Sequence, residues 1–178
     1  MKKILIYLLS VGIFGFASIA NSQTIRIGTE GAYPPWNNIN SAGDLEGAEI
    51  DFGNEACKRM GVTCEWVTQD WDGIIPALLQ GKYDIIIAGM SITEERKEKV
   101  NFTTGYMTDG ARFAVLKNSG LANLNIAGMA KVNLNNAGGK EQAAIGQLIA
   151  AMDGKTVCVQ SSTIHQNFLE KHMSGAVD

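Results

Sequence analysis

The sequence predicts an α/β fold with a parallel sheet, and three features support this prediction. Patterns typical of strands and of helices alternate along residues 24–99. Glycine, proline and helix-capping residues mark the boundaries between them. The run at residues 83–88 is bulky and almost continuously apolar, as expected of a strand that helices cover on both faces. Because helical crossovers join parallel strands, the order β-α-β-α-β predicts one parallel sheet.

The first strand and the first helix follow from local patterns. Residues 24–29 alternate between polar and apolar side chains, which is typical of a half-buried strand. Residues 31–43 contain two prolines and four Asn or Ser residues, and they predict a loop. An amphipathic pattern predicts a helix over residues 50–60. Gly61 follows it in the position where a C-terminal glycine ends a helix.

The next elements complete the alternation. Residues 62–68 predict a second strand, and residues 73–80 predict a second helix that has a proline near its first turn. The third strand leads to Ser91 and Glu94, which have the spacing of a capping box. A further helix is therefore expected to begin at Ser91.

The second half of the sequence predicts a further α/β unit that begins after about residue 112. Its expected elements are two strands and two helices, over residues 111–116, 140–152, 156–159 and 163–173. The expected organisation is a first unit over residues 23–110 and a second unit over residues 111–178. Because two strands would leave a bare sheet edge, we expect this sequence to be a fragment of a longer protein.

The first 22 residues have the pattern of a secretory signal peptide. Lys2 and Lys3 precede a mostly apolar run, and small residues at 18–22 provide a cleavage site. The alternative is a membrane anchor, but the apolar run is short and is interrupted by serines. We therefore expect an exported, periplasmic protein.

The mature sequence is acidic, which argues against nucleic acid or an anionic membrane as a partner. Without Lys2 and Lys3, 13 basic residues remain against 18 acidic ones, a net charge of about −5. No spacing of Cys and His residues is typical of a zinc site, and we expect neither a metal nor a cofactor. His165 and His172 are expected at the surface.

Two of the three cysteines are placed to form a disulfide. Cys57 and Cys64 lie across the end of the predicted helix and the start of the next strand, where they can meet. Export implies an oxidising compartment. We predict a disulfide between them, worth roughly 2–3 kcal/mol in the chain-entropy model. Cys158 lies in a strand-like run and is expected to be a buried hydrophobe.

Residues 82–96 carry the strongest functional signal. A strand ends at Ala88, the short loop Gly89–Met90–Ser91 follows, and Arg96 lies in the next helix. Small ligands bind at the carboxyl ends of strands in open α/β sheets. An Arg fork matches a carboxylate with two parallel hydrogen bonds. The stretch therefore predicts a site for a small carboxylic acid.

Four motifs together resemble one protein family. They are IRIGTEGAYPPW (25–36), LEGAEIDFGNEACKRMGVTCEW (45–66), DWDGIIPALLQGKYDIIIAGMSIT (70–93) and VCVQSST (157–163). In this order and spacing they are similar to the polar amino-acid substrate-binding proteins of bacterial ABC importers, solute-binding protein family 3. The resemblance covers residues 24–178, and it points to the lysine/arginine/ornithine- and opine-binding branch.

The resemblance implies a type II periplasmic binding protein fold, with two α/β lobes and a ligand cleft between them. Lobe 1 would comprise residues 23–110 and lobe 2 residues 111–178, with the first hinge strand near residues 107–112. Family members are longer, so the part that completes lobe 2 and returns to lobe 1 is expected to be missing. That part would supply an acid for the ligand ammonium. The Cys57–Cys64 pair matches a disulfide of the lysine/arginine/ornithine and histidine binders.

The resemblance also implies a ligand site built from both lobes. Its expected residues are Glu30, Tyr33, Trp71, Ala88, Gly89, Met90, Ser91, Arg96, Ser161, Ser162 and Thr163. Arg96 would bind the ligand α-carboxylate, together with the free amides at the helix start near Thr163. Glu30 would pair with a cationic tail held between the aromatic faces of Tyr33 and Trp71.

Three positions depart from the family pattern. Related proteins often have Ser where Ala88 and Gly89 stand, so backbone carbonyls must here replace hydroxyl groups. They usually have Gly where Ser161 stands, which leaves the local backbone path open.

The implied function is a receptor that closes its hinge around a ligand and is then read by an inner-membrane ABC permease. The expected ligand is a basic amino acid or an opine, the receptor is expected to be a monomer, and no catalysis is expected. An exported dehydratase or peptidoglycan-cleaving enzyme on the same scaffold is the alternative, with Glu30 as its acid. A sensor domain is a third option, which would need a transmembrane helix after this sequence. The sequence leaves open whether the ligand is a free amino acid or an opine.

Overall fold

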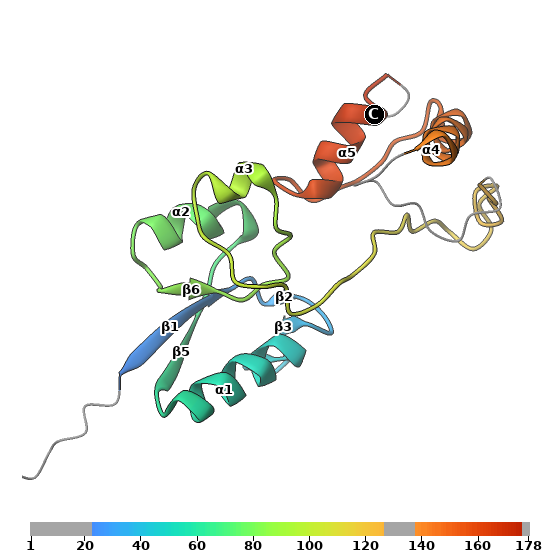
Figure 1. The fold of residues 1–178 in the computed structure, drawn as a ribbon. Coiled ribbons are helices and arrows are strands. Elements are labelled where there is room, and N and C mark those ends of the chain that lie inside the picture. Colours follow the sequence, from blue (N-terminus) through green and yellow to red (C-terminus); the bar gives the residue numbers. More distant parts are fainter. Residues whose placement is uncertain (1–22, 127–137, 176–178) are drawn as a thin grey trace, which may run out of the picture.

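A three-stranded parallel sheet organises the N-terminal part of the protein (Figure 1). The computed structural model describes residues 23–126 and 138–175, so the expected signal peptide lies outside the described residues. β1 (Thr24–Thr29) is central and pairs in parallel with β5 (Thr63–Thr68) and with β6 (Ile85–Ile86). The predicted parallel sheet is confirmed.

Helices cover both faces of this sheet, as the apolar strands predict. α1 (Ala48–Met60) lies on one face, and α2 (Ile74–Leu79), preceded by the 3-10 turn η1 (Trp71–Gly73), lies on the other (Figure 1). Two buried clusters fill the two interfaces. One contains Ile74, Ala77, Tyr83 and Ala88, and the other contains Ile27, Cys57 and Ile87.

The predicted C-terminal end of α1 is confirmed, whereas the predicted start of α3 (Glu94–Lys97) is not. Gly61 adopts the left-handed conformation (φ 70°) after α1, and its N–H bonds to the carbonyls of Cys57 and Lys58 as predicted. The expected capping box at Ser91 is wrong. The cap of α3 lies two residues later, at Thr93, whose side chain accepts the N–H of Arg96.

Residues 31–43 are not a simple loop, which corrects that prediction. β2 (Ala32–Tyr33), β3 (Asn37–Ile39) and β4 (Leu45–Glu46) form a small antiparallel sheet here. The side chain of Asn37, fully buried, accepts the N–H of Gly31 at 2.7 Å. The polar residues that indicated a loop therefore hold a tight turn.

The third strand is shorter than its apolar run, and only Tyr83, Ile87 and Ala88 of that run are buried. Only Ile85 and Ile86 pair with β1. Tyr83 lies in the core, where its hydroxyl donates to the carbonyl of Ile74 at 2.5 Å. A Cβ on Gly28 would lie 2.5 Å from the Tyr83 ring, so only glycine fits there.

The predicted disulfide is present. Cys57 at the end of α1 and Cys64 in β5 are bonded, with their Cα atoms 6.0 Å apart. The bond joins the last turn of α1 to the edge strand of the sheet.

The C-terminal part has the predicted helices without the predicted strands. α4 (Gly139–Met152) and α5 (Ile164–His172) form, and Figure 1 shows them apart from the sheet. The predictions of strands at residues 111–116 and 156–159 are wrong, because no described segment pairs with either one along its length. Cys158 is consequently exposed, where a buried residue was predicted. The long loop expected at residues 119–139 lies partly outside the described residues, since residues 127–137 are not described.

None of the helices described in residues 23–126 and 138–175 is both long and apolar enough to cross a bilayer.

Candidate ligand-binding site

The predicted ligand residues gather where the central strands end. Glu30 and Tyr33 follow β1, Ala88 and the loop to Ser91 follow β6, and Trp71 follows β5. Because these strands are parallel, their carboxyl ends lie at one edge of the sheet. The structure therefore brings these candidates from the first half of the chain to one edge.

Arg96 is half-buried in α3 and bridges two separate chain segments. Its Nη1 donates to the carbonyl of Ser91 at 2.8 Å, and its Nη2 donates to the carbonyl of Ser162 at 3.1 Å. The guanidinium lies over the ring of Trp71, 5.4 Å from the ring centroid. Burial lowers the pKa of Arg96, and the nearby Glu95 carboxylate opposes this shift. A guanidinium remains protonated in proteins, so the group still presents a positive charge where the Ser91 and Ser162 segments meet (the seam).

Residues 160–162 meet the N-terminal part through side-chain hydrogen bonds. Gln160 donates its Nε2 to Glu30 Oε1 at 2.6 Å. The Ser161 hydroxyl faces both carboxylate oxygens of Asp72 at 2.9 Å. The carbonyl of Ser162 accepts the indole N–H of Trp71 at 3.0 Å, in addition to its bond with Arg96. The structure thus brings residues from the two halves of the chain together, as the predicted site requires.

The start of α5 is already hydrogen-bonded within itself. Thr163 caps the helix by accepting the N–H of Gln166 at 3.2 Å. The amide of Ser162 donates to Gln166 Oε1 at 2.7 Å. Ser162 has a positive φ of 58°, an uncommon conformation for a residue with a side chain. A ligand carboxylate at these amides would replace the Gln166 side chain.

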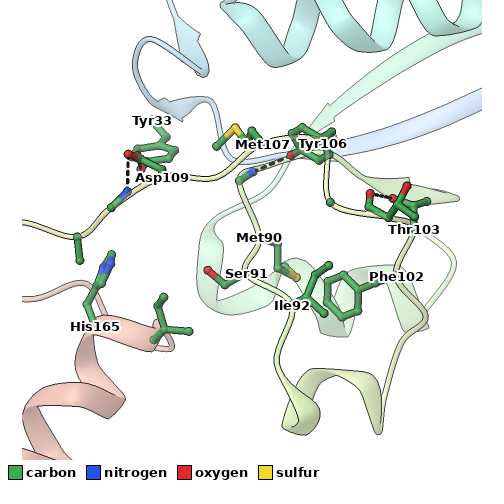
Figure 2. Close-up of a pocket in the computed structure, with 16 residues that line it drawn as sticks. Tyr33, Met90, Ser91, Ile92, Phe102, Thr103, Tyr106, Met107, Asp109 and His165 are labelled. Carbon is green, nitrogen blue, oxygen red and sulfur yellow. Dashed lines mark hydrogen bonds between the residues drawn. The ribbon is translucent and has the colours of Figure 1, made fainter. Parts of the chain in front are cut away.

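Tyr33 has an acidic partner that the sequence did not single out. Its hydroxyl donates to Asp109 Oδ2 at 3.1 Å (Figure 2). Burial, together with this bond, raises the pKa of Tyr33. The N–H of Gly110 and the Tyr33 hydroxyl hold the pKa of Asp109 below its usual range. Asp109 therefore presents a carboxylate beside the aromatic ring.

A cavity of about 220 Å³ lies at this point. Its walls come from Tyr33, the loop at residues 89–92, the segment at residues 102–111, and Ile164 and His165 of α5. Figure 2 shows His165 reaching toward the Asp109 segment. The expected first hinge strand gave a signal for this segment, but its sequence gave no reason to single out Asp109 or Tyr106.

Met90 and Ile164 also line a second cavity, of about 620 Å³. Trp71, Arg96 and Ser162 line it, whereas Tyr33 lines only the first cavity. The two aromatic residues expected to hold one ligand tail therefore border different cavities. The larger volume falls within the range typical of small-molecule sites.

The described residues contain no group of three or more His, Cys, Asp or Glu side chains that could hold a metal ion.

An α/β sheet with charged and aromatic residues at its carboxyl edge, facing a second chain segment, is the arrangement typical of a site for a small polar ligand. The family model of the bacterial extracellular solute-binding proteins, family 3, matches residues 25–171, and the chain belongs to this family. The predicted family is therefore confirmed.

Several curated relatives are similar over much of this chain. The octopine-binding periplasmic protein of Rhizobium meliloti is 43% identical over 159 residues, which are 89% of this chain and 54% of the relative. The L-arginine-binding protein of Pseudomonas aeruginosa is 41% identical over 68% of this chain and 47% of its own length. The lysine/arginine/ornithine-binding periplasmic protein of Escherichia coli is 41% identical over 66% of this chain and 46% of its length. The chain thus spans about half the length of these relatives.

Solved structures support the fold over most of the chain. The ancestral amino acid-binding protein AncCDT-1, described as a precursor of cyclohexadienyl dehydratase, has a TM-score of 0.70 at 30% identity, covering 88% of this chain and 60% of that one. The arginine-bound truncated ArgBP of T. maritima has a TM-score of 0.66 at 30% identity, covering 87% and 62%. The predicted fold class, type II periplasmic binding protein, is confirmed.

Proposed function

We propose that this chain forms the first lobe and part of the second lobe of a periplasmic receptor that binds a cationic amino acid or an opine for an ABC importer. The supporting observation is Arg96, whose half-buried guanidinium contacts both halves of the chain. Arg has five N–H donors, and two of them form the hydrogen bonds described above. The remaining donors are available to a ligand carboxylate.

The cationic character of the ligand rests on the acids around the site. Glu30, Asp72 and Asp109 lie at the seam or line a cavity, each beside an aromatic ring or a polar partner from another segment. Carboxylates and aromatic faces both attract cations. The names of three relatives include octopine, arginine, lysine and ornithine as ligands, which agrees with this charge pattern.

In this receptor, the closed arrangement of the two lobes tells the permease that a ligand is bound. A ligand that contacts Arg96 and the residues near Ser162 stabilises the state in which the two lobes meet, and a membrane permease then recognises that state. The lobes span residues 23–110 and 111–178, the receptor is a monomer, and it needs no cofactor. An exported dehydratase on this fold remains the alternative to be tested.

The test uses the purified full-length protein. Thermal shift and calorimetry against arginine, lysine, ornithine, histidine, glutamine, octopine and nopaline rank the ligands. A ligand at 100 times its Kd stabilises the folded state by about 2.7 kcal/mol. We expect a basic amino acid or an opine to give the largest shift. Preference for glutamine, or turnover of prephenate or arogenate, would overturn the proposal.

A further inference from the structure

A buried carboxylate contacts the loop at residues 88–91, which is called the ligand loop below. Glu49, in the first turn of α1, is only 2% exposed. Its Oε2 accepts Asn37 Nδ2 at 2.6 Å, and its Oε1 accepts the N–H of Gly89 at 2.7 Å. Oε1 also accepts the hydroxyl of Tyr106. Three donors from three different segments therefore converge on one side chain.

Each of these segments carries residues of the proposed site. Asn37 also accepts the N–H of Gly31 at 2.7 Å, and Gly31 lies between Glu30 and Tyr33 in the sequence. Gly89 belongs to the ligand loop. Tyr106 precedes Asp109 in the segment that leads to the second half of the chain.

α1 contacts the Tyr106 segment in a second way. The rings of Phe52 and Tyr106 stack with their centroids 5.4 Å apart. Figure 2 shows the Tyr106 hydroxyl directed at the backbone of the ligand loop, where it also receives the N–H of Gly89 at 3.3 Å. One turn of α1 therefore holds the segment by a hydrogen bond and by ring packing.

We propose that Glu49 is a positioning residue for ligand binding. Its carboxylate fixes the turn at residues 30–33, the loop at residues 88–91 and the segment at residues 106–109 relative to one another. The inference rests on the proposed receptor function, because it assigns Glu49 to the same site without direct contact to the ligand.

Only an acceptor group satisfies all three donors. An ionised carboxylate has acceptors alone, whereas a carboxamide has one acceptor oxygen and one donor nitrogen. In a Gln side chain, the donor nitrogen would face either Asn37 Nδ2 or the N–H of Gly89. Rotation of the Asn37 amide does not relieve this conflict, because its oxygen already accepts the N–H of Gly31.

The backbone of Gly89 leaves little room for adjustment. A Cβ at this residue would lie 3.2 Å from the Tyr33 ring and 3.9 Å from Glu49 Oε1. The loop therefore fits between the aromatic ring of the cavity and the carboxylate. A shift of the carboxylate is transmitted to the loop that lines the cavity.

The test substitutes Glu49→Gln in the full-length protein and measures the Kd of the tightest ligand by calorimetry on folded protein. We expect about a tenfold or greater loss of affinity, since a buried donor is left unsatisfied. Ile27→Val, a core change in β1, is the matched control, and it should lower the melting temperature and leave the Kd unchanged. If Glu49→Gln lowers the melting temperature but binds like wild type, Glu49 is structural only and the inference fails.

Tyr106→Phe keeps the inference testable if Glu49→Gln does not fold. It removes one hydroxyl from an exposed residue and preserves the ring packing. We expect a loss of affinity of roughly threefold to tenfold, because the hydroxyl acts on the ligand only through the position of the loop and the ring packing remains. Wild-type affinity in Tyr106→Phe would exclude the contact with this segment. Failure of the wild-type protein to bind any tested ligand would instead overturn the proposed function, so the two failures are distinguishable.

Discussion

The two halves of this chain differ in what holds them together. In residues 24–100 the strands pair with one another, and helices on both faces enclose two buried clusters. In residues 111–175 the helices α4 and α5 form, but residues 111–116 and 156–159 pair with no described strand. The side chains of Phe113 and Val115 are 44% and 43% exposed.

This difference separates local from non-local determinants of structure. A helix satisfies its hydrogen bonds within one segment, whereas a strand needs a partner elsewhere in the chain. The apolar pattern at residues 111–116 is therefore a necessary condition for a strand and not a sufficient one. The first half has its partners within the described residues.

The largest effect should come from the core of the first half. Ile27 is 1% exposed in the central strand, whereas Leu116 is 77% exposed in the second half. Ile27→Ala should lower the free energy of unfolding by about 2–5 kcal/mol, through lost burial and the cavity left behind. Leu116→Ala should change it by less than about 0.5 kcal/mol. Urea titration followed by circular dichroism measures both, and equal effects would show that the two halves share one core.

The next largest effect should come from the residue that joins the halves. Arg96→Ala removes two hydrogen bonds from a charged donor and the contact with Trp71. We expect roughly a 100-fold loss of ligand affinity, because one hydrogen bond from a charged donor to the ligand carboxylate contributes about 1.5–3 kcal/mol. Calorimetry on the full-length protein measures this, with the neighbouring exposed Lys97→Ala as the control. Wild-type binding by Arg96→Ala would contradict the carboxylate assignment.

The site could be predicted from sequence where one short segment carries the signal. Residues 82–96 contain a strand, a loop and Arg96 within reach of one another, so local order was enough to single them out. Ser161 and Ser162 were identified only through the family resemblance. Their contacts with Asp72 and Trp71 join residues about ninety positions apart, and no local pattern encodes such contacts.

Asp109 and Glu49 show what local patterns miss. Each is a single acid without a distinctive neighbourhood in the sequence. In the structure, each carboxylate accepts hydrogen bonds from residues far away in the sequence. Tyr33 donates to Asp109, and Gly89 and Tyr106 donate to Glu49. The same limit applies to the cap of α3, because Ser91 and Thr93 are both good capping residues by type and only the structure distinguishes them.

A smaller effect is expected from the contact between Ser161 and Asp72. Ser161→Gly removes the hydroxyl that joins the second half to Asp72 without removing the backbone. If this hydroxyl acts by joining the two halves of the chain, every ligand should lose affinity by the same factor, about twofold to tenfold. Calorimetry with two ligands of different size measures the ratio.

A double-mutant cycle provides the control for this contact. Asp72→Asn alone should have a similar effect, and the combination should be less than additive. Losses that differ between ligands would place Ser161 in direct contact with the ligand instead.

The smallest effect is a pH dependence confined to the sheet of the first half. Asp84 accepts three hydrogen bonds from Arg26, including the backbone N–H at 2.8 Å, and the Arg26 bonds lower the pKa of Asp84 below its ordinary 3.8. A lowered pKa in the folded state means that the unfolded state binds the proton more readily. The stabilisation is therefore complete above the ordinary pKa and is lost as the pH falls through the lowered value. Thermal melts of wild type and Asp84→Asn should differ at pH 7 and converge at the acidic end. A difference that grows on acidification would contradict this assignment, since protonation can only weaken the bonds that Arg26 makes to the carboxylate.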